Sequence, residues 1–509
     1  MIRVSALWPN DKIQSECSFH GSNDPWIESL TYDSRTCGPR CIYFANVGTH
    51  TDGHRYIDDA IGRGAVAVVH SLPLEDYQDS ILYIQTTHPR RLYSAFSSAM
   101  HDHPQRKIPI VGVTGTDGKT STCEFLYQIL TKHGFRCGLL DTVSMDDGTG
   151  KRPSPYRQST PEATEIHMFL VRCLANGVRV VVLETTSHGL SNEFARLADI
   201  PFSIAIFTTL TSEHLEFHGN RENYLQAKLN LARQLKSTGT LIMPAAFPFR
   251  KEVLEAAPAG VETLTYTLDE NGCDGDLQVE TIHASLERRY FTTLHCGRMV
   301  RSSIPFAPAF FLRNALGSVL AASRLLDTNA ASLLSDLTWL EPIPGRFEIY
   351  HLADNAVAII DFAHTADAFA RLFVEVRMLR PKGHLIAVFG AAGDRDKSKR
   401  APMGAIAANW CDTLVLTDED PRGEDPQAIF GDIRTGIPME SQAKLYEISD
   451  RTQAIAFALR ICEASDTLLL LGKGHERSIQ YAAKTVDWNE RMALESGMKS
   501  KVKTWEDAE

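Results

Sequence analysis

The stretch Ile108-Pro-Ile-Val-Gly-Val-Thr-Gly-Thr-Asp-Gly-Lys-Thr120 joins an apolar run to a glycine-rich loop that ends in Gly-Lys-Thr. Beyond it, apolar residues recur at helical spacing from Phe125 to Leu130, and Gly134 supplies a stop signal. The pattern predicts a strand, a tight loop and a helix in succession. This order places the loop at the N-terminus of a helix.

The predicted loop is suited to binding an anion. Free N–H groups and the positive end of the helix dipole face the loop, and its glycines let the backbone approach a ligand closely. Lys119 adds a positive charge, and Thr120 offers a hydroxyl to Mg²⁺. The strict phosphate-loop pattern needs a glycine at position 113, where the chain has Val113, so a turn that binds nothing is the alternative. The predicted phosphate-binding residues are Gly115, Thr116, Asp117, Gly118, Lys119, Thr120 and Ser121.

Alternation of strand and helix patterns on both sides of this loop predicts an α/β protein of three domains. Ala65–Val69 and Ile81–Gln85 indicate a small α/β unit before a polar linker at 101–107. From Ile108 to about Leu340 the alternation is typical of a mostly parallel sheet covered by helices. Two prolines and a glycine in 341–345 interrupt the pattern, which then restarts. The predicted domains are residues 1–105, 106–340 and 341–509.

Composition excludes several classes of protein. The chain has 509 residues, enough for about three domains at roughly 150 residues each, and a formal net charge of −11 that disfavours nucleic acid and anionic lipid as partners. It has neither a run of about 18 apolar residues nor a signal peptide at its start, so we expect a cytoplasmic protein. Cys37 and Cys41 form the closest cysteine pair, but no second pair completes a zinc site, and we expect incidental thiols.

Two further strands end in groups that can bind a metal. The strand predicted at 178–183 is followed by Glu184, and the strand at 202–207 leads to His214. In an open parallel sheet the carboxyl ends of the strands form the ligand crevice, so both groups can reach a metal held at Thr120. A helix-capping acid and a core histidine are the alternatives for each residue alone. Together they favour Mg²⁺ ligation.

Seven motifs occur in the order typical of one enzyme family. They are G-T-D-G-K-T, E-T-T-S-H-G-L, F-T-T-L-T-S-E-H-L-E-F-H-G, P-G-R-F-E, D-F-A-H-T-A-D-A, G-D-R-D-K-S-K-R and G-K-G-H-E. The chain resembles the Mur ligases from about residue 30 to 490, and most of all the branch of UDP-N-acetylmuramoyl-tripeptide synthetases. The phosphate loop of that family is G-T-x-G-K-[ST], so the opening stretch is intact by the family's own rule.

The resemblance implies three domains: a small N-terminal α/β domain that binds UDP, a central phosphate-loop ATPase domain with a parallel sheet, and a Rossmann-like C-terminal domain. It implies that ATP phosphorylates the carboxylate of a UDP-sugar peptide and that an amine then displaces phosphate to form an amide. Lys119, Glu184, His214 and Lys228 are the implied catalytic residues. Lys228 matches a lysine that the family carries as a carbamate, which would join Thr120, Glu184 and His214 as a metal ligand. Asn314 resembles the family's adenine contact, and Arg346 and Asp361 resemble residues that reach the phosphates and ribose of ATP from the third domain.

The resemblance also implies where the UDP-sugar peptide binds. Ser34 is the expected UDP contact, with a simple serine turn as the alternative. Ser159, Thr160, Ser187 and Arg196 match residues that contact the muramoyl peptide. Ser159 replaces the family's usual threonine, and Arg196 lies about two residues farther from the preceding motif than in many members.

The expected amino-acid site lies in the third domain. Arg395 matches an arginine that grips the α-carboxylate of the incoming amino acid, for which an arginine fork is well shaped. Gly472 and Glu476 belong to a second selective segment. Members that use meso-diaminopimelate carry D-N-P-R where this chain has Glu-Asp420-Pro-Arg422. The added charge of Asp420 favours the bare ammonium of lysine or ornithine, whereas Arg422 favours a distal carboxylate, so the preference for a simple diamino acid is slight.

Two other functions fit the sequence less well. A related ligase such as folylpolyglutamate synthetase usually lacks the N-terminal module, and a nucleotide-gated interaction module would not need Lys119, Glu184, His214 and Lys228. The implied partners are a UDP-N-acetylmuramoyl dipeptide and a diamino acid, with ATP and Mg²⁺ as cofactors and a monomer as the expected state. Because the ATP and amino-acid contacts lie on separate domains, we also expect the domains to close on binding.

Overall fold

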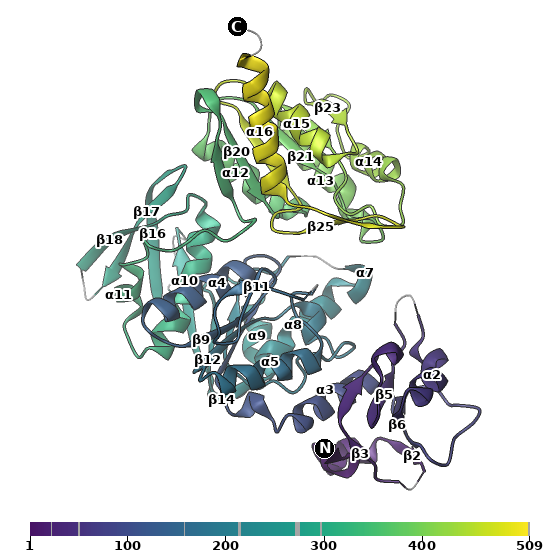
Figure 1. The fold of residues 1–509 in the computed structure, drawn as a ribbon. Coiled ribbons are helices and arrows are strands. Elements are labelled where there is room, and N and C mark those ends of the chain that lie inside the picture. The colour runs from purple at the N-terminus through teal and green to yellow at the C-terminus, as the bar shows by residue number, and fades with distance from the viewer. Residues whose placement is uncertain are drawn as a thin grey trace.

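The computed structural model describes residues 1–506 except 22, 49–50, 157, 212–214, 270–274 and 296–297. Three α/β regions follow one another along the chain, each built around its own sheet (Figure 1). The N-terminal region is purple, the central region blue to teal, and the C-terminal region green to yellow. The chain therefore has the three-part α/β architecture expected from its alternating patterns.

The N-terminal region contains a five-stranded sheet in the order β2-β7-β6-β5-β4, with β2 antiparallel to its neighbour and the other strands parallel. Its core includes Ile42, Phe44, Val69 and Phe96. The strands are β1 (Ile2–Arg3), β2 (Ser18–His20), β3 (Trp26–Ile27), β4 (Ser29–Thr31), β5 (Cys41–Ala45), β6 (Ala65–His70) and β7 (Leu82–Gln85); the helices are α1 (Asp11–Ser15), α2 (Ile57–Gly62) and α3 (Pro89–Met100).

The central region is organised around a sheet of eleven described strands, in the order β11-β10-β9-β12-β8-β13-β14-β15-β16-β17-β18. Its strands are β8 (Ile110–Thr114), β9 (Cys137–Leu140), β10 (Ser144–Asp146), β11 (Arg152–Pro153), β12 (Val180–Glu184), β13 (Phe202–Phe207), β14 (Leu235–Pro244), β15 (Glu262–Leu268), β16 (Leu277–Ser285), β17 (Arg288–His295) and β18 (Arg298–Ile304). Its helices are α4 (Lys119–Lys132), α5 (Ala163–Ala175), α6 (Ser187–Leu190), α7 (Leu215–His218), α8 (Arg221–Arg233), α9 (Arg250–Ala256), α10 (Ala309–Leu325) and α11 (Ala330–Leu334).

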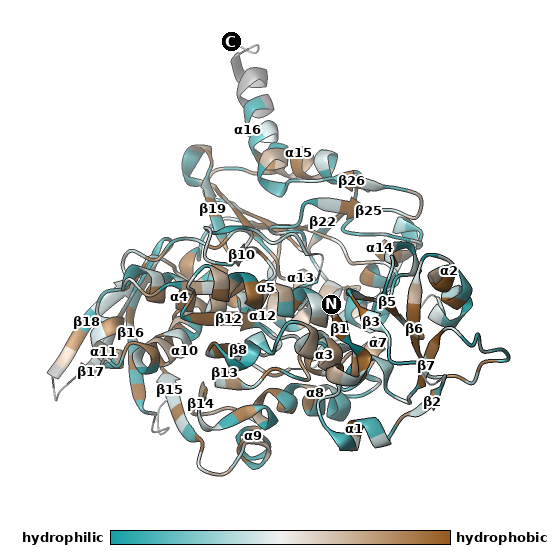
Figure 2. Cartoon of the chain, turned by 60° about the horizontal axis from the view of Figure 1, so that its bottom comes forward, coloured by the Kyte–Doolittle hydropathy of each residue, from teal (hydrophilic) through white to brown (hydrophobic). Residues whose placement is uncertain are grey.

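Strand β8 lies between two parallel neighbours and is buried along its whole length, as a run of apolar residues covered on both faces requires. Its register pairs Val113 with Glu184 of β12 and Thr114 with Phe207 of β13. The ends of these three strands therefore meet at one edge of the sheet, directly before the loop that leads into α4. Figure 2 shows the brown, apolar strands β8, β12 and β13 in the interior of this region.

The C-terminal region has a six-stranded sheet in the order β19-β20-β24-β21-β22-β23, parallel except for β19. Its strands are β19 (Glu348–His351), β20 (Val357–Asp361), β21 (Leu385–Phe389), β22 (Thr413–Leu416), β23 (Lys444–Glu447) and β24 (Thr467–Leu471), with a hairpin of β25 (Ser478–Gln480) and β26 (Thr485–Asp487). Its helices are α12 (Ala366–Leu379), α13 (Arg400–Trp410), α14 (Pro426–Arg434), α15 (Arg451–Ile461) and α16 (Glu490–Glu506).

Polar contacts join the central and C-terminal regions. The Gln128 side chain on α4 binds both backbone groups of Glu341: its Oε1 accepts from the Glu341 N–H at 2.8 Å, and its Nε2 donates to the Glu341 carbonyl at 3.3 Å. Farther away, Arg289 of β17 forms a buried ion pair of 2.8 Å with Glu375 of α12. The segment that begins the third region therefore contacts α4, the helix that follows the phosphate loop.

The strands predicted from apolar runs agree with the structure within about two residues. A difference of two residues at the start occurs at β12, predicted over 178–183 and observed from Val180 to Glu184. The Val178 N–H donates to the Cys173 carbonyl and closes the end of α5, so the strand begins later. In the N-terminal region Cys41 is buried and Cys37 half-buried, both as free thiols. Within the described residues, no helix has the length and apolar character needed to cross a membrane.

Candidate active site

The loop between β8 and α4 has room for glycine alone at two positions. A Cβ atom on Gly115 would collide with the Thr208 hydroxyl. Gly118 has φ of +83°, and a Cβ atom there would lie 2.5 Å from Asn314 Oδ1. Asn314 of α10 therefore lies against the loop, next to the residue that precedes Lys119. This geometry brings together the predicted phosphate loop and the predicted adenine contact.

Lys119 and Thr120 begin α4 and face the crevice at the strand ends. Lys119 Nζ donates to the carbonyls of Gly115 at 3.2 Å and Thr116 at 2.7 Å. Thr120 is buried, and its hydroxyl donates to Glu184 Oε2 at 2.9 Å. The predicted cation and the predicted metal-binding hydroxyl are thus held on one turn of helix beside a carboxylate.

Glu184 is only 3% exposed and is held by more than Thr120. Its Oε2 also accepts from the Thr142 N–H at 3.1 Å and lies 2.8 Å from the Thr142 hydroxyl, which is 2.6 Å from Ser159 Oγ. Thr142 follows the end of β9 and was not predicted from the sequence. Its place just after a buried parallel strand is the same signal that identified Glu184, and that signal could have found it.

Lys228 lies on α8 with 1% of its surface exposed. Its Nζ donates to the Gly115 carbonyl at 2.6 Å and lies 4.6 Å from the centre of the Tyr224 ring. The predicted carbamate position is therefore directly beneath the phosphate loop. His214, the second predicted imidazole or carboxylate ligand, lies outside the described residues.

The oxygen donors in this crevice fit a magnesium ion. Mg²⁺ prefers oxygen ligands, and the Thr120 hydroxyl and the Glu184 carboxylate are already 2.9 Å apart. Among the residues whose placement is described, no group of three histidine, cysteine, aspartate or glutamate side chains is arranged around a metal position.

The segment expected to bind the muramoyl peptide is packed against the same strand end. Thr160 Oγ1 donates to the Glu184 carbonyl at 2.9 Å, and Arg196 donates to the Thr160 carbonyl at 3.0 Å. Arg196 also pairs with Glu162 at 2.7 Å. Ser187 begins α6 and is buried. These contacts bring Ser159, Thr160, Ser187 and Arg196 to one side of the crevice despite the unusual spacing of Arg196.

Two predicted ATP contacts come from the start of the third region. Arg346 donates to Thr120 Oγ1 at 3.4 Å, and its guanidinium lies 4.3 Å from the centre of the Phe362 ring. Asp361 accepts from the N–H groups of Phe347 at 2.8 Å and Ala363 at 2.7 Å. Burial lowers the pKa of Arg346, and the charge of Asp361 opposes this shift. Arg346 therefore contacts the first turn of the phosphate-loop helix, although the two are far apart in the sequence.

A second contact from the third region was not predicted. Arg371 on α12 forms an ion pair with Asp117 of the phosphate loop. Arg371 lies on an ordinary amphipathic helix, and nothing in the local sequence distinguishes it from a surface arginine.

A cleft of about 1500 Å³ separates the central region from the C-terminal region. On the central side it is lined by Ser159, Thr160 and Arg196; on the other side it is lined by Arg395, Asp420, Arg422 and Glu476. The Arg395 guanidinium lies 5.2 Å from the centre of the Phe217 ring of α7, across the cleft. These predicted sugar-peptide and amino-acid contacts therefore face the same space, whereas the predicted contacts Ser187 and Gly472 do not line it. Ser34 of the N-terminal region is buried and does not line it.

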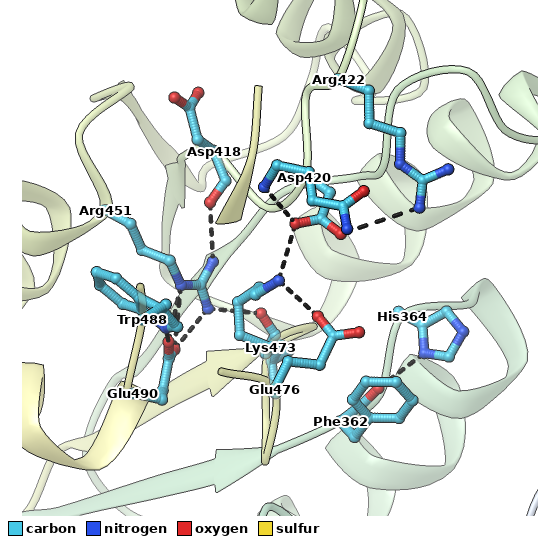
Figure 3. Close-up of polar contacts among 12 residues, drawn as sticks. Phe362, His364, Asp418, Asp420, Arg422, Arg451, Lys473, Glu476, Trp488 and Glu490 are labelled. Atoms are coloured by element: carbon cyan, nitrogen blue, oxygen red, sulfur yellow. Dashed lines mark hydrogen bonds and ion pairs between the residues drawn. The ribbon is translucent and has the colours of Figure 1, made fainter. Parts of the chain in front are cut away.

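The amino-acid end of the cleft contains a dense set of charges (Figure 3). Lys473, which has no exposed surface, lies between Asp420 Oδ1 at 3.0 Å and Glu476 Oε2 at 2.5 Å. Arg422 lies 3.9 Å from Asp420 Oδ2. A Cβ atom on Gly472, where φ is +96°, would lie 2.6 Å from Glu419 Oε2. Lys473 was not assigned a role from the sequence, because a lysine in a glycine-rich turn is normally solvated.

A second buried ion pair, Arg451 with Glu490, binds the backbone of the two segments that form the amino-acid end of the cleft. Arg451 and Glu490 are fully buried and 2.5 Å apart. Arg451 also donates to the carbonyl of Leu471 at 2.8 Å and to that of Asp418 at 3.4 Å, the residues that precede the two selective segments. Figure 3 shows this pair below Asp418, with Lys473 nearby.

Three family models match successive parts of the chain. Residues 27–99 match the family model described as Mur ligase family, catalytic domain; residues 113–322 match the Mur ligase middle domain; and residues 345–474 match the Mur ligase glutamate ligase domain.

Individual relatives cover nearly the full length. A UDP-N-acetylmuramyl-tripeptide synthetase of Borrelia garinii subsp. bavariensis is 37% identical over 485 residues, 94% of each chain. A UDP-N-acetylmuramoyl-L-alanyl-D-glutamate–2,6-diaminopimelate ligase of Syntrophomonas wolfei subsp. wolfei is 31% identical over 486 residues, covering 95% of this chain and 97% of the relative. In fold, the chain is similar to the MurF ligase of Thermotoga maritima in complex with ADP, with a TM-score of 0.61, 18% identity, and coverage of 94% and 98%.

Proposed function

Because the chain belongs to the Mur ligase family, we propose that it joins a diamino acid to UDP-N-acetylmuramoyl-L-alanyl-D-glutamate, at the expense of ATP, in peptidoglycan synthesis. It is an ATP-dependent ligase whose full-length relatives are named as tripeptide synthetases. The observation that carries the proposal is the cleft, which has the Thr160 segment on one side and Arg395 with the charged pocket on the other. Thr160 in turn donates to the carbonyl of Glu184, which lies in the phosphate-loop crevice.

The roles proposed for the ATP-binding residues follow from the charge of the phosphate groups. Transfer of a phosphoryl group depends on positioning and on neutralising the charge of the phosphate oxygens. Lys119 and Arg346 would face the phosphates, while Asn314 would contact the adenine. Thr120, Glu184, His214 and Lys228 as a carbamate would hold Mg²⁺, which supplies further charge neutralisation when bound. The burial of Lys228 beneath Gly115 is consistent with a modified lysine there, and a mass increase of one carbon dioxide in bicarbonate buffer would test it.

The amino acid would be oriented by its two ends. Arg395 would hold the α-carboxylate near Phe217, which leaves the α-amine free to attack the acyl phosphate formed on the central side. In that step nitrogen bonds to the carbonyl carbon, phosphate leaves with the bonding electrons, and the amine loses a proton. The side chain would then extend toward Asp420, Arg422 and Glu476.

The balance of charge in this pocket favours lysine or ornithine over meso-diaminopimelate. The carboxylates of Glu419, Asp420 and Glu476 face two cations, Lys473 and Arg422, which leaves one formal negative charge. Among the described residues, Glu419 Oε2 is buried without a hydrogen-bond partner. A lone ammonium would satisfy both the charge and this acceptor, whereas a distal carboxylate would add a further negative charge.

The test is phosphate release from ATP with UDP-N-acetylmuramoyl-L-Ala-D-Glu and one amino acid at a time. We expect turnover with lysine or ornithine and a lower kcat/KM with diaminopimelate. Turnover only with glutamate and a folate would contradict the proposal, although the match of residues 27–99 to the family makes that alternative weaker. Size-exclusion chromatography with light scattering is expected to show a monomer.

A further inference from the structure

Lys473 is an unusual lysine because it is fully buried beneath a polar cleft. It does not line the cleft, but both of its carboxylate partners, Asp420 and Glu476, do. Asp420 Oδ1 accepts from Lys473 and also from the Gln480 N–H at 3.0 Å, so this oxygen is fixed from two directions. The buried Lys473 ammonium thus forms ion pairs with both carboxylates, which themselves line the cleft.

The backbone turn explains why this lysine points inward. Gly472 and Gly474 both have positive φ, of +96° and +47°, and the Glu476 N–H donates to the Lys473 carbonyl at 2.8 Å. This tight turn places the side chains of Lys473 and Glu476 on one side. A Cβ atom on Gly345 would collide with the His475 backbone, so the segment that begins the third region packs on the turn from outside.

Each carboxylate keeps one oxygen for other partners. Asp420 uses Oδ1 for Lys473 and presents Oδ2 toward Arg422, 3.9 Å away. Glu476 uses Oε2, and its second oxygen points away from Lys473 in Figure 3. Burial lowers the pKa of Lys473, but the charges of Glu476 and Asp420 outweigh this effect, so its pKa is raised and it stays an ammonium. A side-chain ammonium entering the pocket would meet two anions with oriented oxygens.

We propose that Lys473 is a positioning residue for amino-acid selection: it keeps Asp420 and Glu476 as two adjacent anions, each with one oxygen directed to the side-chain ammonium of the incoming amino acid. This inference rests on the proposed function. It assigns the lysine no contact with substrate. The selectivity of the pocket therefore depends on a residue that the amino acid never touches.

Removing the lysine charge has a specific electrostatic consequence. Asp420 and Glu476 both reach one nitrogen, so without it they face each other, and two close carboxylates share a proton. Arg422 is the other cation beside Asp420, and Glu419 adds a negative charge. His475, which has Arg346, Lys473 and Arg477 as its charged neighbours, stays neutral because burial lowers its pKa to about 3. The shared proton competes with the ammonium of the ligand, so affinity becomes dependent on pH.

The experiment compares Lys473→Gln with the wild-type enzyme from pH 6.5 to 8.5, measuring KM for lysine or ornithine, for ATP and for the UDP-dipeptide. The ratio of the variant's amino-acid KM to that of the wild type is expected to be larger at pH 6.5 than at pH 8.5, by at most about 100-fold, the limit that one competing proton sets over two pH units. The other two KM values are expected to stay within about twofold. The double variant Lys473→Gln/Glu476→Gln is expected to lose the pH dependence, and Lys473→Arg is expected to restore part of the affinity.

Arg400→Met is the matched control. Arg400 is also fully buried and bound to two carboxylates of the same region, Glu424 and Asp432, but neither of these partners lines the cleft. Its loss is expected to lower Tm and to leave the KM ratio independent of pH. A pH-independent ratio for Lys473→Gln, or an equal rise in all three KM values, would overturn the proposal.

A variant that keeps the lysine covers the case in which Lys473→Gln does not fold. Glu476→Gln raises the formal charge of the pocket by one, so the preference for lysine over diaminopimelate is expected to fall about tenfold; an unchanged preference overturns the inference. The two levels of failure are distinct. Absence of wild-type turnover with every diamino acid contradicts the proposed function, whereas normal wild-type turnover with an insensitive Lys473 variant contradicts this inference alone.

Discussion

The nucleotide end and the amino-acid end of the cleft are built in different ways. At the nucleotide end, Lys119 and Thr120 belong to one strand-loop-helix unit, and their partners are carbonyls of that loop or groups at neighbouring strand ends. At the amino-acid end, Arg395, Asp420 and Lys473 come from three separate segments and are balanced by charge. The first kind of site is specified by local sequence, the second by which distant segments meet.

The largest expected effect tests the local end. Lys119→Ala removes the cation beside the phosphates and is expected to lower kcat by about 10³-fold while KM for the amino acid stays nearly constant. Phosphate release under saturating substrates measures it. Lys132→Ala, at the exposed far end of the same helix, is the control and is expected to keep the wild-type rate. A loss smaller than tenfold for Lys119→Ala would remove the functional contrast between the two ends.

The next effect tests the assembled end. Arg395→Ala is expected to raise KM for the amino acid by roughly 10- to 100-fold, the range for a hydrogen-bonded charge, with little change in KM for ATP. Arg395→Lys is expected to recover only part of the loss, because an ammonium cannot bind a carboxylate through two parallel hydrogen bonds. Steady-state kinetics with each substrate varied in turn is the measurement. Equal changes in both KM values would show that the two ends are not separable.

A smaller effect concerns stability at the assembled end. Burial raises the pKa of Asp418 to about 6, with Tyr481 acting in the opposite direction through a hydrogen bond. Since this folded-state pKa exceeds the unfolded value of about 3.9, the stabilising contribution is full below about pH 4 and is lost as the pH rises through 6. Asp418→Asn is therefore expected to be more stable than wild type at pH 7.5, by on the order of 2 kcal/mol, and this gain is expected to shrink toward pH 4. Urea unfolding at both pH values measures the difference; a gain independent of pH would contradict it.

The smallest effect lies between the two ends. Asp117 and Arg371 are each more than one-third exposed, so their ion pair is expected to contribute less than about 1 kcal/mol. A double-mutant cycle with Asp117→Asn and Arg371→Ala, read as KM for ATP, is expected to give a coupling below that value and weaker still in high salt. A coupling above about 2 kcal/mol would mean that the phosphate loop depends on the third region as strongly as the amino-acid pocket does.

The contrast also explains what could be predicted from the sequence. Strand and helix alternation predicted the three-part α/β fold, because apolar runs and helical spacing are local properties. Glu184 was placed next to Thr120 by a general rule about strand ends, and the structure brings them to 2.9 Å. The grouping of Arg395, Asp420, Arg422 and Glu476 was expected only through resemblance to a family, since the segments are distant in the chain.

Other features had no usable signal. Lys473 was quoted within its motif without a role, because burial of a lysine depends on the carboxylates that surround it in space. The positive φ values of Gly472 and Gly474, which turn it inward, cannot be distinguished in sequence from those of any glycine turn. The contact of Arg371 with Asp117 likewise depends on how two regions pack, and the role of His214 stays a prediction.

The two hydrogen bonds between the Gln128 side chain and the Glu341 backbone lie at the junction of the central and third regions, a point about which one region could turn against the other. These two hydrogen bonds attach the start of the third region to the helix that follows the phosphate loop, so a change in the position of that helix would strain or break them. A chimera that exchanges the third region between related chains would therefore have to keep Gln128 on α4 and an equivalent backbone position at 341. A pair of fluorophores, one on the central region and one on the third region, would report rotation of the two regions about this junction.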